Sequence, residues 1–176
     1  TSDGSKIPME DMCQLTERQT EYKYKSSYEQ IAKVIAQYSY VPLLDLTDFY
    51  EQVFFSWLVG NNDMHLKNFS LYAPKGKWFL TPAYDLLNVS MVNPKDTEEM
   101  ALTLNGRKKR ITKSDFVSAM TLSGIASKVF DNMLEKYRKL LPKFHSMIDM
   151  SFLDDECKET YKQGITSRLE RISNQK

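Results

Sequence analysis

Four side chains that could take part in catalysis or metal binding lie within six consecutive residues of this chain. Asp63 supplies a carboxylate, His65 an imidazole, Lys67 an ammonium group and Asn68 a carboxamide. A second carboxylate, Asp85, follows Asn68 by seventeen residues. An acid that accepts a hydroxyl proton, together with carboxylate and carboxamide oxygens that suit Mg²⁺, is the set of groups that phosphoryl transfer from a nucleotide requires.

The spacing of these residues predicts a role for three of them. Asp63 and Asn68 are five residues apart, which is the offset between the catalytic Asp and the metal-binding Asn in protein-kinase catalytic loops. We therefore predict that Asp63 is the catalytic base and that Asn68 and Asp85 bind Mg²⁺.

The two other polar residues complete the candidate catalytic group with less specific roles. His65 could act as a base, but Asp63 already fills that role in a kinase-type loop. We therefore expect His65 to order the loop through hydrogen bonds. Lys67 could neutralise the transferred phosphate, and a solvated lysine is an equally good interpretation.

The sequence around these residues resembles a known family. Residues 62–70 read Asn-Asp-Met-His-Leu-Lys-Asn-Phe-Ser, and residues 82–87 read Pro-Ala-Tyr-Asp-Leu-Leu. Both runs resemble the C-terminal part of HipA-type serine/threonine kinases, the toxins of bacterial toxin–antitoxin pairs. Three further runs agree with that family, at 9–15, 24–28 and 96–106. The resemblance extends from about the first residues to about Phe116.

The resemblance implies a fold, an activity and partners. The fold would be a mostly helical α+β C-terminal kinase lobe with one or two small β-hairpins. The activity would be transfer of the γ-phosphate of ATP, with Mg²⁺, to a serine or threonine of a protein. The family's substrate class is an aminoacyl-tRNA synthetase. Its usual partner is a small helix-turn-helix antitoxin, through which the toxin contacts DNA only indirectly.

The nucleotide-binding half of a kinase is expected to lie outside this chain. The six glycines form no Gly-x-Gly motif, and no Val-Ala-Ile-Lys-like strand precedes Asp63. HipA-type kinases carry those parts N-terminal to the region matched here. We expect residues 1–176 to form one catalytic subdomain, with loop 60–70 and a metal-side segment at 82–87. The N-terminal half would come from the same chain or from a separate subunit.

The first residue is not Met, which favours an excised or processed fragment. We expect the isolated 176 residues to fold, because their apolar patterns are internally consistent. We also expect them to bind Mg-ATP weakly and to transfer no phosphate, because positioning of the phosphates is most of this catalysis.

The composition excludes several other classes of protein. With 41% hydrophobic and 27% charged residues, the chain is typical of one soluble globular domain. Its net charge of +1 argues against a protein built mainly to hold polyanions. No apolar run is long enough to span a membrane. Cys13 and Cys157 match no disulfide or zinc framework, which favours the reducing cytoplasm.

A buried helix is predicted to lead into the loop. Its apolar residues cover too wide an arc for a surface helix. Asp45 or Thr47 can cap its start, and Gly60 can supply the left-handed residue that ends it. Two β-like runs, 68–72 and 78–81, then flank a turn sequence and predict a hairpin. That hairpin would bring Asp85 to within about 4–5 Å of Asn68, close enough to share one metal.

Other elements are predicted from local signals. Pro8 opens a short helix to about Leu15, and residues 16–26 form a solvated loop. The remaining predictions are a helix capped by Ser27, with Ile31, Val34, Ile35 and Tyr38 on one face; a second hairpin at Asn105-Gly106; a helix capped by Thr112 or Ser114; a helix from Ile125 to Ile148 that Pro142 kinks or divides; and a last helix capped by Ser151.

Three alternatives stay open at this stage. The Asp-x-His-x-x-Asn pattern also fits phosphoinositide-like or small-molecule kinases, although no membrane-binding stretch is evident. A non-catalytic module that docks an antitoxin or a second subunit is the alternative without enzyme activity.

The role of the basic run also stays open. Arg107–Arg110 could contact DNA phosphates or an acidic partner, or be a solvated arm.

Overall fold

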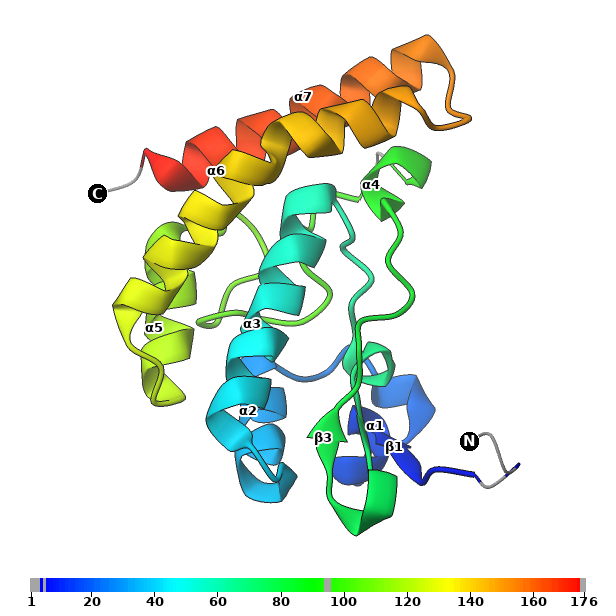
Figure 1. The fold of residues 1–176 in the computed structure, drawn as a ribbon, viewed down its shortest axis with the longest axis vertical. Helices are drawn as coiled ribbons and strands as arrows, with labels where there is room; N and C mark the ends of the chain where they lie inside the picture. The colour runs from blue at the N-terminus through cyan, green and yellow to red at the C-terminus, as the bar shows by residue number, and fades with distance from the viewer. Residues whose placement is uncertain (1–3, 5, 94–95, 175–176) are drawn as a thin grey trace.

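The computed structural model describes residue 4, residues 6–93 and residues 96–174 of the chain. Helices dominate these residues, and a small three-stranded antiparallel sheet lies to one side of them (Figure 1). The helices are α1 (Met12–Leu15), α2 (Tyr28–Tyr38), α3 (Pro42–Val59), α4 (Val89–Val92), α5 (Lys113–Leu122), α6 (Ser127–Asp149) and α7 (Asp155–Ser173). The strands are β1 (Met9–Asp11), β2 (Ser70–Tyr72) and β3 (Phe79–Leu80). The predicted mostly helical α+β class is confirmed.

Helix α3 is the central element of the core. Phe54 of this helix meets Phe116 of α5 and Phe130 of α6 edge-on, with ring centroids 5.4 Å and 5.3 Å away. It also meets Tyr137 of α6 at 5.2 Å. Helices α2 and α7 pack against α3 as well. The predicted burial of this helix is therefore confirmed, and the element that leads into loop 60–70 is held on several sides.

The start of α3 differs from the prediction. The helix begins at Pro42, and neither Asp45 nor Thr47 caps it. Proline opens a helix by itself, because its fixed φ is helical and its missing N–H is not needed there. Asp45 instead is buried within the first turn, where its carboxylate accepts from Ser39 Oγ at 2.6 Å and from Leu80 N at 2.8 Å. It ties α3 to β3.

The N-terminal segment corrects a second prediction. Residues 9–11 are not helical: they form β1, in which Met9 pairs with Tyr72 and Asp11 with Ser70. Only after Asp11 does a helix begin, and Asp11 caps it in a reciprocal pair with Gln14. Local helix signals were present, but residues 9–11 form hydrogen bonds to β2 as a strand, so the helix begins only after them, at Met12.

Helix α2 agrees with its predicted start. Ser27 caps it by accepting from Gln30 N at 3.2 Å, and Ile31 and Ile35 are buried. Tyr38 departs from the expected inward face and is 44% exposed, because it is the last residue of the helix and lies beyond the core.

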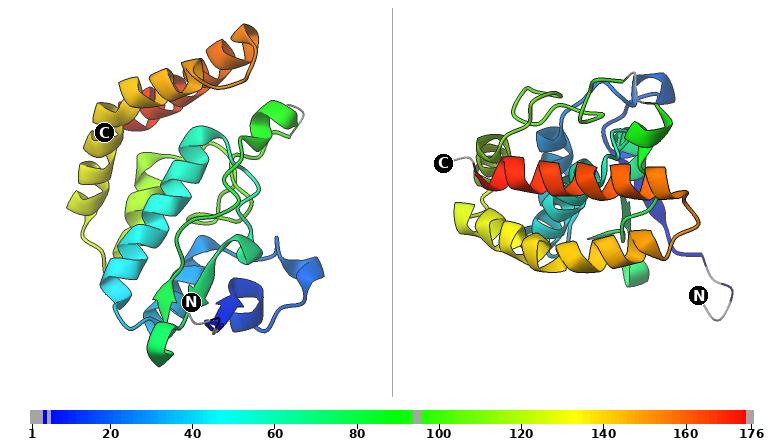
Figure 2. Two further views of the ribbon diagram at one scale, coloured as in Figure 1. Left: turned by 45° about the vertical axis from the view of Figure 1, so that its right-hand side comes forward. Right: turned by 90° about the horizontal axis from the view of Figure 1, so that it is seen from above.

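Helices α6 and α7 form an antiparallel pair across one end of the molecule (Figure 2). Helix α6 continues through Pro142 as one element, so proline does not divide it. Ser151 does not cap α7: its hydroxyl donates to Ile148 O at 2.6 Å. Asp154 caps α7 instead, accepting from Cys157 N at 2.7 Å, because α7 begins a few residues later than predicted.

The second predicted hairpin is reduced to a tight turn. Around Asn105-Gly106, the described residues contain a single antiparallel bridge between Leu104 and Arg107. Thr112 caps the following helix, as one of the two predicted alternatives, in a reciprocal pair with Asp115.

Candidate active site

The candidate catalytic loop leaves α3 through a close-packed glycine. Gly60 has a φ of 80°, in the left-handed region that glycine favours, as predicted. A Cβ at this position would lie 2.5 Å from Ser90 Oγ and 2.9 Å from Asn88 Oδ1. The backbone N–H of Asn61 then donates to Ser56 O at 2.8 Å, so the loop begins from a fixed point.

The structure brings Asn68 and Asp85 into direct contact. Asn68 Nδ2 donates to Asp85 Oδ2 at 2.7 Å, while Asn68 Oδ1 accepts from His65 N at 3.1 Å. Asp85 has a φ of 57°, an uncommon value for a residue with a side chain. Its carbonyl oxygen accepts from Asn61 Nδ2 at 3.2 Å, which helps to hold that conformation. Strained backbone of this kind clusters at functional sites.

The residue types at this contact fit Mg²⁺, but Asn68 turns its Nδ2 toward Asp85 and its Oδ1 toward His65 N, so the carboxamide would have to turn to offer its oxygen to an ion beside Asp85. Asp85 is exposed and Asn68 is buried, so the carboxylate can reach a bound cation without opening the core. Carboxylate and amide oxygens are hard ligands of the type that Mg²⁺ prefers. Within the described residues, no cluster of three or more His, Cys, Asp or Glu side chains could hold a metal. An ion at Asn68 and Asp85 would therefore keep water or phosphate oxygens among its ligands.

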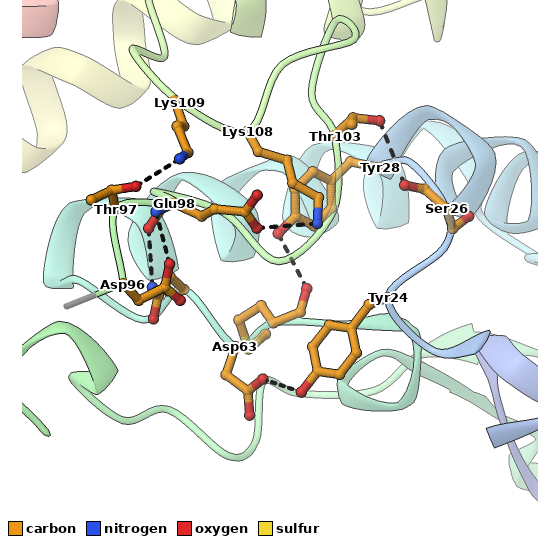
Figure 3. Close-up of polar contacts among 12 residues, drawn as sticks. Tyr24, Ser26, Tyr28, Asp63, Asp96, Thr97, Glu98, Thr103, Lys108 and Lys109 are labelled. Carbon is orange, nitrogen blue, oxygen red and sulfur yellow. Dashed lines mark hydrogen bonds and ion pairs between the residues drawn. The ribbon is translucent and has the colours of Figure 1, made fainter. Parts of the chain in front are cut away.

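At the other end of the loop, Asp63 faces a hollow. Its carboxylate Oδ1 accepts a hydrogen bond of 2.6 Å from the hydroxyl of Tyr24, and Figure 3 shows that hydroxyl pointing at the carboxylate. Asp63 N donates to Asn61 Oδ1 at 3.2 Å. The hollow has a volume of about 540 Å³. Its polar lining residues are Tyr24, Asn62, Asp63, Asn93, Asp96, Glu98 and Lys108. A half-buried carboxylate at a hollow can receive a proton from a molecule bound there.

His65 orders the loop through its backbone. Its N–H donates to Asp63 O at 2.8 Å and to Asn68 Oδ1 at 3.1 Å, so one group links the two ends of the loop. The imidazole is buried, and its Nδ1 has no hydrogen-bond partner in the part of the chain that the structure describes. Burial, and next the nearby charge of Lys23, lower the pKa of His65, which keeps the ring neutral.

Lys67 points toward the sheet. Its ammonium lies 2.7 Å from Asp11 Oδ2, and this hydrogen bond raises the pKa of Lys67. The carbonyl oxygen of Lys67 accepts from the hydroxyl of Tyr84 at 2.7 Å, and that hydroxyl also contacts Ser70 Oγ at 2.7 Å. Asp11 and Tyr84 thus support the loop.

Sequence reasoning missed three residues that contact the loop: Tyr24, Asp11 and Tyr84. Tyr24 lies in a segment that was expected to be a solvated connection. Asp11 was expected in a helix, and only its strand register with β2 brings it to the loop. The available signals were that Tyr84 directly precedes the predicted metal ligand Asp85, and that Asp11 and Tyr24 lie in the runs 9–15 and 24–28 that resemble the family.

The basic run 107–110 is largely engaged with its own chain. Lys108 pairs with Glu98 at 3.2 Å, and Lys109 donates to Thr97 Oγ1 at 2.6 Å (Figure 3). Arg107 lies 3.9 Å from a carboxylate oxygen of Asp115. Three of the four side chains therefore bind groups of the same chain, which neither the external-partner hypothesis nor that of a solvated arm had predicted.

Together, the fold and the site define a helical lobe with a kinase-type arrangement of an acid, a carboxamide and a second acid. The sequence profile of the HipA-like C-terminal domain matches residues 2–144. The chain therefore belongs to the HipA-like C-terminal domain family.

Two relatives carry the names of kinases. "Putative kinase" of Haemophilus influenzae is 43% identical over 65 residues, which are 36% of this chain and 19% of the relative. "Putative kinase Y4dM" of Sinorhizobium fredii is 27% identical over 150 residues, which are 84% of this chain and 35% of the relative. The chain thus spans about a third or less of the length of these relatives.

Two solved structures share the fold. A chain of the complex of HipA, HipB and operator DNA from Shewanella oneidensis superposes with a TM-score of 0.82, at 20% identity, over 97% of this chain and 46% of that chain. The kinase CtkA of Helicobacter pylori superposes with a TM-score of 0.60, at 16% identity, over 98% of this chain and 67% of that chain. In the described residues, no helix is both long and apolar enough to cross a membrane.

Proposed function

We propose that this chain is the catalytic C-terminal part of an ATP- and Mg²⁺-dependent serine/threonine protein kinase. The observation that carries the proposal is the loop itself. Asp63 lies at a hollow, and five residues later Asn68 contacts Asp85 at 2.7 Å. This arrangement supports a proton acceptor at one end of the loop and, at the other end, the Asp85 carboxylate beside a carboxamide whose oxygen would become a ligand when it turns away from His65 N.

In this mechanism, Asp63 binds the hydroxyl of the acceptor and orients it toward the phosphate. Its carboxylate takes the hydroxyl proton as the new O–P bond forms and the bond to the leaving ADP breaks. Asn68 and Asp85 would hold Mg²⁺, which would neutralise the phosphate charges when bound. Lys67 lies beside Asn68 in sequence, but its ammonium is paired with Asp11 Oδ2 at 2.7 Å, so it would add positive charge near the phosphates only after it leaves that partner.

The cellular role belongs to the same proposal. The complete protein would include the nucleotide-binding N-terminal half and would act as the toxin of a toxin–antitoxin pair. Its partner would be a helix-turn-helix antitoxin, with DNA contacted only through that partner. Its substrate class would be an aminoacyl-tRNA synthetase, and its compartment the cytoplasm. Membership in the HipA-like family supports this role, and so does the fold that the chain shares with a protein solved in complex with HipB and operator DNA.

Substitution of the base tests the proposal directly. In the complete protein, Asp63→Asn should reduce phosphate transfer by about 10²–10⁴-fold, because it removes the general base. Mg-ATP should still bind, since Asp63 is not a main nucleotide anchor. Radiolabel transfer from γ-³²P-ATP and calorimetry with Mg-ATP measure the two properties.

A matched control is Asp155→Asn, an exposed carboxylate in the first turn of α7. It should leave both transfer and binding unchanged. Near wild-type turnover of Asp63→Asn would remove Asp63 as the base. Phosphate transfer to inositol lipids, but not to protein, would favour the alternative of a phosphoinositide-like kinase.

A further inference from the structure

A tyrosine outside the catalytic loop makes the closest polar side-chain contact to the proposed base. The hydroxyl of Tyr24 donates to Asp63 Oδ1 at 2.6 Å. The same phenol ring meets the imidazole of His65 edge-on, with centroids 5.0 Å apart and an angle of 79° between the planes. Tyr24 is therefore fixed by two residues of the loop, and its ring packs against the buried His65.

The segment 23–28, to which Tyr24 belongs, also holds the loop through its backbone and through a second tyrosine. Leu66 N donates to Lys23 O at 3.2 Å. The hydroxyl of Tyr28 donates to Met64 O at 3.1 Å (Figure 3). Each of the four consecutive residues 63–66 is thus contacted by the segment 23–28. A solvated connection would not match the loop residue by residue in this way.

The protonation of Tyr24 decides the direction of its hydrogen bond. Partial burial, followed by the hydrogen bond to Asp63, raises the pKa of Tyr24 to about 12. The phenol therefore keeps its proton at physiological pH and donates a hydrogen bond to the carboxylate. A charge-assisted bond of this kind is roughly twice as strong as a neutral one.

We propose that Tyr24 is a positioning residue for Asp63, which extends the proposed kinase function and rests on it. By occupying Oδ1, the phenol fixes the carboxylate and leaves Oδ2 to accept the hydroxyl of the phosphate acceptor. During transfer the acceptor proton passes to Oδ2, the acceptor oxygen bonds to the γ-phosphorus, and ADP leaves with the electrons of the broken bond. Tyr24 keeps its own proton throughout.

The geometry of the hollow supports positioning over obstruction. Tyr24 and Asp63 line the same hollow of about 540 Å³, so the phenol lies beside the space for an acceptor. Tyr24 also remains 41% exposed, so it does not seal that space.

The test removes a single oxygen atom from the complete kinase. Tyr24→Phe keeps the ring that packs on His65 and loses only the donor. The single-turnover rate of transfer from γ-³²P-ATP, followed as incorporation into the protein itself, should fall roughly tenfold, the size expected when one charge-assisted hydrogen bond is lost. The ATP concentration at half-maximal rate should stay unchanged, because the nucleotide ligands lie at the other end of the loop.

The profile of rate against ATP concentration separates positioning from a general structural effect. Without the phenol donor the maximal rate should fall, while the ATP concentration at half-maximal rate should not move. Tyr22→Phe is the matched control: Tyr22 lies two residues away, and its ring packs under the ammonium of Lys25. It should leave the rate and the profile unchanged, and both variants should keep the wild-type melting temperature.

The outcomes distinguish this inference from the function on which it rests. If Asp63→Asn abolishes transfer while Tyr24→Phe leaves rate and profile unaltered, the positioning role is wrong and the base assignment stands. A faster Tyr24→Phe enzyme would show that the contact inhibits, which also overturns the inference. If Asp63→Asn transfers phosphate at the wild-type rate, the proposed function fails first.

Discussion

The two ends of the candidate catalytic loop, residues 60–70, are held in different ways. At the end proposed to bind Mg²⁺ (the metal end), Asn68 contacts Asp85 directly, and the hydroxyl of Tyr84 bonds to both Ser70 and the carbonyl of Lys67. These groups belong to the β2–β3 hairpin and the segment that follows it. At the end that holds the proposed base (the base end), the carboxylate of Asp63 receives, among the described residues, one side-chain hydrogen bond, from Tyr24, and lies at a hollow.

The difference corresponds to what each end would have to do. A metal pair needs two oxygens at a fixed separation, which a hairpin provides through its register. A base needs a held carboxylate that an incoming molecule can still reach, which a single donor at the edge of a hollow provides. The N–H of His65 joins the two ends, so they are separate in support but coupled through one backbone group.

Charge removal at the metal end should give the largest difference between the two ends. Asp85→Asn in the complete protein should weaken Mg-dependent ATP binding by about 100-fold or more, because even indirect partners of metal ligands contribute roughly 10–100-fold. Asp63→Asn should leave this binding intact. Calorimetry with ATP, with and without Mg²⁺, measures the contrast, and equal losses in both variants would show that the two ends do not have separate roles.

Removal of one hydroxyl should test the rigidity of the metal end. Tyr84→Phe loses the contacts to Ser70 and Lys67 and leaves a carbonyl without its donor, so the free energy of unfolding should fall by about 1–3 kcal/mol. Urea denaturation measures this change, with Tyr72→Phe on the neighbouring strand as the control. A stability equal to that of the wild type would mean that the hairpin does not depend on this support.

The charge of Lys67 offers a smaller effect. Lys67→Met should slow transfer roughly tenfold, less than the ~10²–10³ expected for a fully enclosed donor, because its side chain is 38% exposed. Asp11→Asn keeps a residue that caps α1 equally well and removes only the ion-pair partner. It should slow transfer less than Lys67→Met. Single-turnover rates that match the wild type in both variants would support the interpretation of Lys67 as a solvated lysine.

The smallest effect concerns the buried imidazole of His65, the residue whose backbone N–H links the two ends. The folded pKa of His65 lies below its ordinary value of 6.5, so the unfolded chain binds the proton first as the pH falls. The contribution of His65 to stability is therefore complete above about 6.5 and is lost as the pH falls toward the folded pKa. His65→Gln should show a shallower decrease in urea midpoint between neutral and mildly acidic pH. An unchanged slope would mean that the imidazole is not buried as described.

Local patterns predicted the elements whose signals are complete within a few residues. The buried α3, the left-handed Gly60 and the β2–β3 hairpin all follow from periodicity and turn chemistry. The wrong predictions are places where a local signal met a competing partner. Residues 9–11 pair with β2 instead of forming a helix, and Asp45 is drawn into a bond with β3 instead of capping α3.

The sequence by itself determined the chemical groups of the candidate site and the order in which the loop presents them. It also determined the hairpin that returns Asp85 to Asn68, because seventeen residues around one turn leave few other arrangements. Only the tertiary structure decided what supports the loop. Tyr24 is 39 residues from Asp63 and Asp11 is 56 residues from Lys67, and no periodic pattern encodes such pairs. Their contacts arise when strand pairing and core packing bring distant segments together.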